Sequence, residues 1–240
     1  MGARKYPATR DSMAGIEEAL QELRFGKPVL VFDSEARERE TDIVIAAQFA
    51  TSEAIRTMRK DGGGLICQTM PYEVAQSIGL RYLADIFMDS RFEVFKLLEP
   101  NDIPYGDKSA FSATINHRKT FTGISDRDRA LTISSFAKLV EKAQSDKGAA
   151  LSMLREQFRS PGHVFLLIAA EGLLSSRRGH TELSTYLVSK AGLIPSAAIV
   201  EMLGDDGASL SKKLAMEYAA SNGLVFVEGS DIIAHFNQKP

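Results

Sequence analysis

The stretch from Asp33 to Asp42, DSEARERETD, brings five carboxylates and two arginines together. If it is extended, side chains alternate between its two faces, so Glu38, Glu40 and Asp42 point the same way. Carboxylates held close together raise one another's pKa values unless a cation or strong donors lie among them. A hard divalent metal such as magnesium supplies that cation. The stretch therefore suggests a metal site, although a solvated loop whose acids pair with its arginines has the same composition.

A second polar cluster, RRGHTE from Arg177 to Glu182, stands directly before a segment with helical periodicity. Two arginines, a glycine, a hydroxyl and the free amides of a helix N-terminus are what an anion site needs, because the dipole and the N–H groups favour a phosphate there. His180 in this cluster could bind a metal or transfer protons. The alternative is that Thr181 is only the N-cap and that the arginines are solvated.

Three further features are weaker signals. His163 follows Pro161 and Gly162 at the start of an apolar run and could be structural or functional. Cys67 lies in an apolar strand pattern, which favours an inert core thiol, and no nucleophile elbow accompanies it. The glycine triplet 62–64 follows a helix pattern and precedes a strand pattern, the reverse of a phosphate loop, so we interpret it as a connector that could let backbone approach a ligand.

Hydrophobic periodicity outlines the elements that must position these residues. Strands are predicted at residues 29–32, 43–47, 65–67, 111–115, 163–168, 197–202 and 224–227. Helices are predicted at residues 13–26, 51–59, 72–79, 125–143, 182–191 and 209–222, followed by a short one from residue 230. Residues 99–109 contain two prolines and indicate a long loop, of the kind that forms a lid or a binding loop or is disordered.

This alternation of strands and helices predicts an α/β fold, with a layered sheet and helices on its faces. No repeat, low-complexity segment or linker divides the chain. Residues 1–240 are therefore predicted to form a single domain, in which residues 1–11 are a flexible leader and Asp11 or Ser12 caps the first helix.

Composition excludes several classes of protein. The chain has 240 residues, of which 44% are hydrophobic and 25% charged, as in ordinary globular proteins. Its net charge is −2 and its basic residues are scattered, so no basic surface is predicted that would bind a polyanion. One cysteine excludes an intrachain disulfide and a thiolate cage for zinc. No apolar run approaches the roughly 20 residues that span a bilayer, and the N-terminus lacks the apolar part of a signal peptide. We therefore expect a cytoplasmic protein that binds neither nucleic acid nor membrane.

Four motifs together resemble one known family. FDSEARERETD, TFTGISDRDR (120–129), RSPGHVFLL (159–167) and RRGHTE occur in the order found in 3,4-dihydroxy-2-butanone 4-phosphate synthase, an enzyme of riboflavin biosynthesis. Each motif alone would be a weak signal, but four in register are specific. With the segments around them, the resemblance covers roughly residues 12–235.

The resemblance implies an activity and its requirements. The family converts D-ribulose 5-phosphate into formate and 3,4-dihydroxy-2-butanone 4-phosphate, with magnesium or manganese, two divalent ions per site, and no organic cofactor. It also implies a homodimer with its sites near the subunit interface, and a mixed sheet flanked by helices. Some members carry a fused GTP cyclohydrolase II domain, whereas this chain stops at Pro240, so we expect a monofunctional enzyme.

The resemblance also assigns residues. The metal ligands match Glu38 and His180. The substrate contacts match Arg37, Glu38, Asp42, Arg177, Gly179, Thr181 and Glu201. Positions associated with catalysis match Asp33, Glu40, Cys67, His163 and Glu201. Within this set we expect Arg177 and Thr181 to hold the phosphate, and the proton transfers to fall to Asp33, Glu40 and His163.

Two other functions would use the same residues. A metal-dependent sugar-phosphate isomerase or aldolase needs the same carboxylates, histidine and arginines, but releases no formate. A non-catalytic sensor would bind a sugar phosphate with a metal and without turnover, although the full set of acid–base candidates argues against it.

Overall fold

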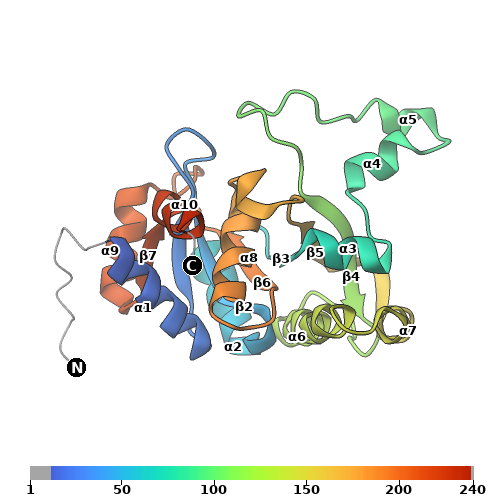
Figure 1. Ribbon diagram of the computed structural model, residues 1–240, viewed down its shortest axis with the longest axis horizontal. Helices are drawn as coiled ribbons and strands as arrows, with labels where there is room; N and C mark the ends of the chain where they lie inside the picture. The colour runs from blue at the N-terminus through green and yellow to red at the C-terminus, as the bar shows by residue number, and fades with distance from the viewer. Residues whose placement is uncertain (1–11, 239–240) are drawn as a thin grey trace.

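A mixed seven-stranded sheet lies at the centre of the computed structural model, which describes residues 12–238. Its strands run in the order β4-β5-β3-β6-β2-β1-β7 (Figure 1). They are β1 (Val29–Phe32), β2 (Thr41–Ala46), β3 (Cys67–Met70), β4 (Phe111–His117), β5 (Phe158–Ile168), β6 (Ala197–Glu201) and β7 (Val225–Glu228). Two pairs, β1 with β7 and β3 with β5, are parallel, and the other neighbours are antiparallel. The mixed sheet confirms the expected fold class, whereas the predicted leader 1–11 and the Asp11 cap lie outside the described residues.

Helices cover both faces of this sheet. They are α1 (Ser12–Arg24), α2 (Ser52–Thr57), α3 (Tyr72–Ile78), α4 (Leu83–Met88), α5 (Glu93–Lys96), α6 (Asp126–Ala143), α7 (Lys147–Gln157), α8 (His180–Lys190), α9 (Lys212–Asn222) and α10 (Gly229–Asn237). The residues of α1, α8 and α10 pack with Val29 and Val31, and those of α2, α3, α6, α7 and α9 pack with Leu30. Successive strand residues point to opposite faces of the sheet, and helices cover both faces. β1 and β2 are therefore buried at every position.

One strand begins earlier than its local signals predict. β5 starts at Phe158, five residues before His163, because Phe158 pairs with the end of β4 beyond a bulge. At this end β5 has no partner on its other side, so Pro161 removes no ladder hydrogen bond there. Gly162 is required in the strand, since a Cβ atom there would overlap the backbone of Ile115.

Other boundaries shift because of side-chain contacts that periodicity does not encode. β3 starts at Cys67 rather than at Leu65, which is exposed and whose N–H donates to the Glu201 carboxylate at 2.8 Å. α9 starts after Ser211, which caps it, rather than at Ser209. The helical patterns also leave out α4, α5 and α7, which are short or weakly amphipathic.

The segment between α5 and β4 has no regular structure, as the composition of residues 99–109 predicts. In Figure 1 it runs along the same end of the molecule as the loop between β1 and β2, and α4 and α5 project from the body beside it. Two segments that the sequence analysis singled out, residues 33–42 and 99–109, therefore lie at the same end of the sheet. Across residues 12–238, no helix combines the length and the apolar character that a membrane span needs.

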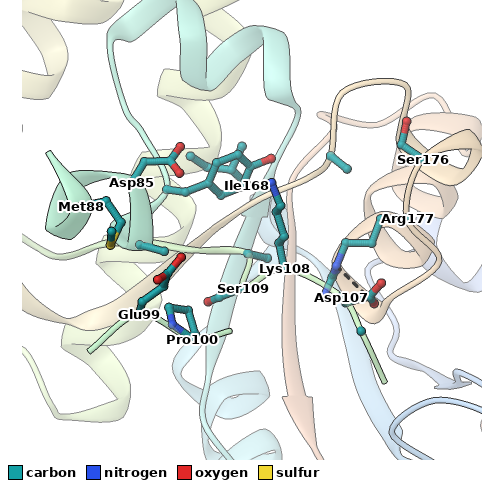
Figure 2. A pocket seen from close by; sticks show the side chains of 15 residues that line it. Asp85, Met88, Glu99, Pro100, Asp107, Lys108, Ser109, Ile168, Ser176 and Arg177 are labelled. Carbon is teal, nitrogen blue, oxygen red and sulfur yellow. Dashed lines mark ion pairs between the residues drawn. The ribbon is translucent and has the colours of Figure 1, made fainter. Parts of the chain in front are cut away.

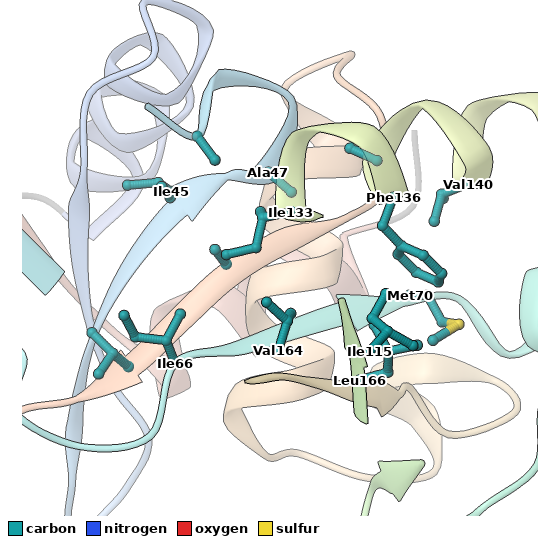
Figure 3. Close-up of a cluster of buried hydrophobic side chains, with 14 of the residues drawn as sticks. Ile45, Ala47, Ile66, Met70, Ile115, Ile133, Phe136, Val140, Val164 and Leu166 are labelled. Atoms are coloured by element: carbon teal, nitrogen blue, oxygen red, sulfur yellow. The ribbon is translucent and has the colours of Figure 1, made fainter. Parts of the chain in front are cut away.

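The larger hydrophobic cluster lies between the sheet and α6 (Figure 3). Phe136 of α6 is completely buried, and its ring meets the ring of Phe158 edge to face at 5.7 Å between centroids. Val164 and Leu166 of β5 face the same cluster, so α6 is held against the sheet half that includes β4 and β5.

We expect Phe136→Ala to lower the free energy of unfolding by about 3–5 kcal/mol, because it leaves a cavity in a packed core. Phe25→Ala removes the same side chain at a position that is 77% exposed, and should change that free energy by less than about 0.5 kcal/mol. Denaturant titration of both variants measures the difference. Equal destabilisation by the two substitutions would contradict this location of the core.

Candidate active site

The acidic stretch is a hairpin loop rather than an extended strand. Residues 33–40 turn the chain from β1 into the antiparallel β2, and Arg39 lies in the left-handed region at a φ of 61°. Asp33 holds the loop, because its Oδ2 accepts the Glu38 N–H at 2.9 Å and its Oδ1 accepts the Glu40 N–H at 3.1 Å. The expectation of three carboxylates in one alternating row is therefore wrong, since a turn breaks the period of two.

The three carboxylates instead meet different partners. Glu38 Oε2 lies 3.2 Å from His180 Nδ1, and Glu40 Oε1 accepts the Ser209 hydroxyl at 2.5 Å. Asp42, in β2, is buried, and its Oδ1 lies 3.6 Å from His180 Nε2. Two of the three carboxylates thus converge on His180, and the third contacts the loop before α9.

His180 is the first residue of α8, which begins two residues earlier than predicted. Its Nε2 lies 3.2 Å from the Val31 carbonyl oxygen, so we assign the proton of the neutral ring to Nε2, donating to that oxygen. The Nδ1 lone pair then points toward Glu38. Metal-binding histidines commonly donate their other N–H to a carbonyl group, which fixes the tautomer in this way.

The buried charges shift one another's pKa values. Burial raises the pKa of Asp42 to about 8, although His180 opposes the rise. Burial alone would lower the pKa of His180, but Asp42 and Glu38 outweigh it and raise the value to about 9. Burial would likewise raise the pKa of Glu38, yet His180 and Arg37 hold it at about 2. Asp42 and His180 therefore keep protons that a bound cation would displace.

The donor set fits a hard divalent ion. Ligand atoms of Asp33, Glu38 and His180 lie within 4.8 Å of one another. Both carboxylate oxygens of Asp42 are buried and have no hydrogen-bond partner among the described residues. Carboxylate oxygens with one imidazole nitrogen suit magnesium or manganese, and a buried carboxylate without donors is compensated by such a charge.

The arginines of the second cluster surround the N-terminus of α8. Gly179 is its N-cap, and a Cβ atom there would collide with the guanidinium groups of both Arg37 and Arg177. Arg177 Nη1 donates to Glu182 Oε2 at 2.6 Å, which anchors its side chain at the first turn. Thr181 lies inside that turn and is buried, so it is not the N-cap. Two guanidinium groups and a helix N-terminus form an anion site.

One cavity of about 180 Å³ brings most of the predicted residues together. Its lining includes Arg37, Glu38, Asp42, Cys67, Arg177, His180, Thr181 and Glu201. Gly179 lies against two of the arginines in this lining, while Asp33 lies behind the loop that it holds. Glu38, His180, the two arginines, Cys67 and Glu201 therefore share one chamber, although they come from separate segments of the chain.

Glu201 and Cys67 occupy the floor of this cavity on neighbouring strands. Burial raises the pKa of Glu201, and its carboxylate accepts the Leu65 N–H at 2.8 Å. The glycine triplet serves this contact, because a Cβ atom on Gly64 would overlap the Glu201 side chain. Burial also raises the pKa of Cys67, with Glu201 and Asp42 adding to it, so this residue is a neutral thiol.

His163 does not line the cavity, and neither does Glu40, which contacts Ser209. His163 is exposed on β5, where its Nδ1 contacts the Asn116 side chain. It lies four residues before Leu167, which does line the cavity, and that spacing is about 13 Å along a strand. Within one chain, His163 is therefore away from the metal ligands.

Two residues of the 99–109 loop belong to the site but have no distinct signal in the sequence. Asp107 Oδ2 accepts Arg37 Nε–H at 2.7 Å, and the Arg37 guanidinium lies 4.7 Å from the centre of the Tyr105 ring. A second cavity of about 420 Å³ lies beyond this loop, and Figure 2 shows Asp107 and Arg177 side by side at its edge. The loop pattern identified the segment, but nothing local distinguishes Asp107 from Asp102.

The pKa shifts predict that stability depends on pH and on metal. Asp42 and His180 have raised pKa values in the folded state, so their stabilisation is present at low pH and is lost as pH rises through about 8 and about 9. Without metal, the melting temperature should fall between about pH 6 and about pH 8.5, and magnesium should raise it more at the higher pH. Thermal unfolding measures this, with Asp42→Asn flattening the pH dependence. An equal magnesium effect at both pH values would contradict the coupling.

Comparisons with known proteins identify the family of this chain. The model of the 3,4-dihydroxy-2-butanone 4-phosphate synthase family matches residues 17–235. The chain is 48% identical over 224 residues to the 3,4-dihydroxy-2-butanone 4-phosphate synthase of Methanothermobacter thermautotrophicus, which covers 92% of this chain and 95% of that protein. It is 42% identical over 226 residues to the protein of the same name from Archaeoglobus fulgidus, covering 92% and 94% of the two chains.

A solved structure supports the same relationship. A 3,4-dihydroxy-2-butanone 4-phosphate synthase crystallised in complex with two magnesium ions matches with a TM-score of 0.73 and 29% identity, over 92% of this chain and 95% of that one. Sequence and fold thus agree over nearly the full length of both proteins. This chain belongs to the 3,4-dihydroxy-2-butanone 4-phosphate synthase family.

Proposed function

We propose that this protein converts D-ribulose 5-phosphate into 3,4-dihydroxy-2-butanone 4-phosphate and formate, as a cytoplasmic enzyme of riboflavin biosynthesis. The observation that carries the proposal is the single cavity in which Glu38 and His180 lie beside the anion site of Arg37 and Arg177. The two products together contain all the atoms of the substrate, so the reaction needs no oxidant, reductant or organic cofactor. Acids, bases, a cation site and a phosphate site are sufficient.

The arginines bind and orient the substrate. Arg177 and the N-terminal turn of α8, which includes Thr181, hold the phosphate group through guanidinium and backbone N–H donors. Arg37 reaches the same place from the hairpin loop. The phosphate therefore anchors one end of the sugar while the ketone and the adjacent hydroxyls extend toward Glu38 and His180.

Glu38 and His180 hold the divalent cation that the chemistry requires. Magnesium or manganese, when bound, polarises the ketone and stabilises the negative charge that develops when the C3 proton is removed. Because the family member described above binds two magnesium ions, we propose two ions here. Asp33 is the nearest further carboxylate of this cluster, and Asp42 faces the same histidine.

The remaining acids and bases move protons. Removal of the C3 proton needs a base, loss of the C1 hydroxyl as water needs an acid, and after the skeletal rearrangement a water molecule adds back as C4 leaves as formate. Burial raises the pKa of Glu201, which suits a carboxyl group that takes and returns a proton. We propose that Glu40 and Cys67 also take part in these proton transfers. Asp33 accepts three hydrogen bonds, which favours a role in positioning the loop.

Formate release tests the activity directly. Incubation with ribulose 5-phosphate and magnesium should yield formate, while Glu38→Gln or His180→Ala should lower kcat by at least about a hundredfold, because each removes a metal ligand. Glu35→Gln, an exposed position in the same loop, is the matched control and should keep full activity. Pentose phosphates without formate would indicate an isomerase or aldolase, and metal-dependent binding without turnover would indicate a sensor.

We also propose a homodimer with the site near its interface. The helices α1, α8 and α10 pack over β1, β2, β3, β6 and β7, and leave Phe111 and His163 exposed on the same side of β4 and β5. Phe111 stacks edge to face on Phe165 at 6.0 Å, which makes an apolar sheet surface of the kind that a second subunit covers. The projecting segment of α4 and α5 adds exposed apolar side chains, among them Phe92 and Leu97 at the two ends of α5. In such a dimer His163 completes the site of the partner subunit.

Mixed dimers test this arrangement. Glu38→Gln and His163→Ala should each be inactive alone, but unfolding and refolding them together in equal amounts should restore about a quarter of the wild-type activity. Half of the dimers would be mixed, and in each of these one site would combine an intact Glu38 with the partner's intact His163. No recovery from a mixture that forms mixed dimers would show that His163 acts within its own subunit or not at all.

A further inference from the structure

The phosphate site already contains a carboxylate from the protein itself. Asp107 Oδ2 accepts Arg37 Nε–H at 2.7 Å and lies 3.5 Å from Arg177 Nε. The Arg37 and Arg177 side chains are 9% and 14% exposed, and Asp107 comes from the long loop that covers them. An anion of the chain therefore occupies the arginines to which we assign the substrate's phosphate.

This carboxylate leaves part of the anion site unsatisfied. Arg37 Nη2 and Arg177 Nε are buried and have no hydrogen-bond partner among the described residues. Both guanidinium groups abut Gly179 at the start of α8. A buried N–H without an acceptor is costly, and a phosphate has more acceptor oxygens and more charge than a carboxylate. The site is thus built for a larger anion than the one that it holds.

Asp107 also couples the anion site to the metal ligands. Two residues before it, Tyr105 interacts with Glu38 through its hydroxyl, and its ring lies against the Arg37 guanidinium. Glu38 is one of the proposed metal ligands. Displacement of this loop from the arginines would therefore separate Tyr105 from Glu38 as well.

We propose that Asp107 is an internal competitor for the phosphate group, and that it makes entry selective for dianionic phosphate esters. This inference rests on the proposed function, because it takes Arg37 and Arg177 as the phosphate site. A dianion displaces the single charge of Asp107 from the two arginines, whereas an unphosphorylated sugar has no group that can do so. Asp107 thus keeps the loop over the empty site and yields to a substrate that carries a phosphate.

Binding of inorganic phosphate to the full-length protein tests the proposal. At a pH of about 8, where phosphate is a dianion, Asp107→Asn should bind phosphate on the order of three- to tenfold more tightly than the wild type, because the competing state is weakened. Asp107→Ala should change affinity in the same direction. Asp102→Asn removes the same charge from an exposed position of the same loop and should bind phosphate as the wild type does. Calorimetry measures each affinity.

The contrary outcomes separate this inference from the proposed function. Unchanged or weaker phosphate binding in both Asp107 variants would overturn it and leave Asp107 as a residue that positions Arg37. If Asp102→Asn tightened phosphate binding as much as Asp107→Asn, the effect would come from the overall charge of the loop. The proposal that Asp107 competes with phosphate would again be overturned. If the wild type bound no phosphate and Arg177→Met left the KM for ribulose 5-phosphate unchanged, the phosphate site itself would fail, and with it both proposals.

Discussion

The contact between Glu38 and His180 joins two segments that lie 142 residues apart, and the arrangement of the whole site depends on it. Glu38 belongs to the loop between β1 and β2, and His180 opens α8, which packs on the sheet face above those strands. α8 packs against both β1 and β2, which brings the helix N-terminus over the hairpin. Once these two residues meet, both arginines, Asp42 and Glu201 are carried into the same cavity.

That convergence creates an excess of buried negative charge, which the protein must offset. Arg37 offsets part of it by pairing with Glu38 at 2.7 Å and with Asp33 at 3.3 Å. Protons offset another part, since Asp42 and His180 both have raised pKa values. A site with this balance has a standing affinity for a divalent cation, because the cation replaces protons without rearranging the ligands. Metal binding and the stability of this end of the sheet are thus two aspects of one electrostatic requirement.

The loop that contains Tyr105 and Asp107 adds a second level of organisation. It lies over the arginines and contacts Glu38, so a movement of this one segment would change the proposed phosphate site and the proposed cation site together. The uncovered face of β4 and β5 is a separate feature, because His163 is exposed there, away from the cavity of its own chain. One chain therefore gathers most of the predicted site residues in one cavity and presents a separate acid–base candidate on β5.

The sequence by itself determined the chemistry and most of the elements. Four motifs identified the family and part of the cavity lining, and the periodicity placed all seven strands, because residue type and local period are properties of neighbouring positions. Only the tertiary structure decided that the acidic stretch turns, that Asp33 holds it, and that Glu40 faces Ser209. It also separated Asp107 from Asp102 and moved His163 out of the cavity. These outcomes depend on strand order and loop conformation, which arise from contacts between residues far apart in the chain, and such contacts have no local period to read.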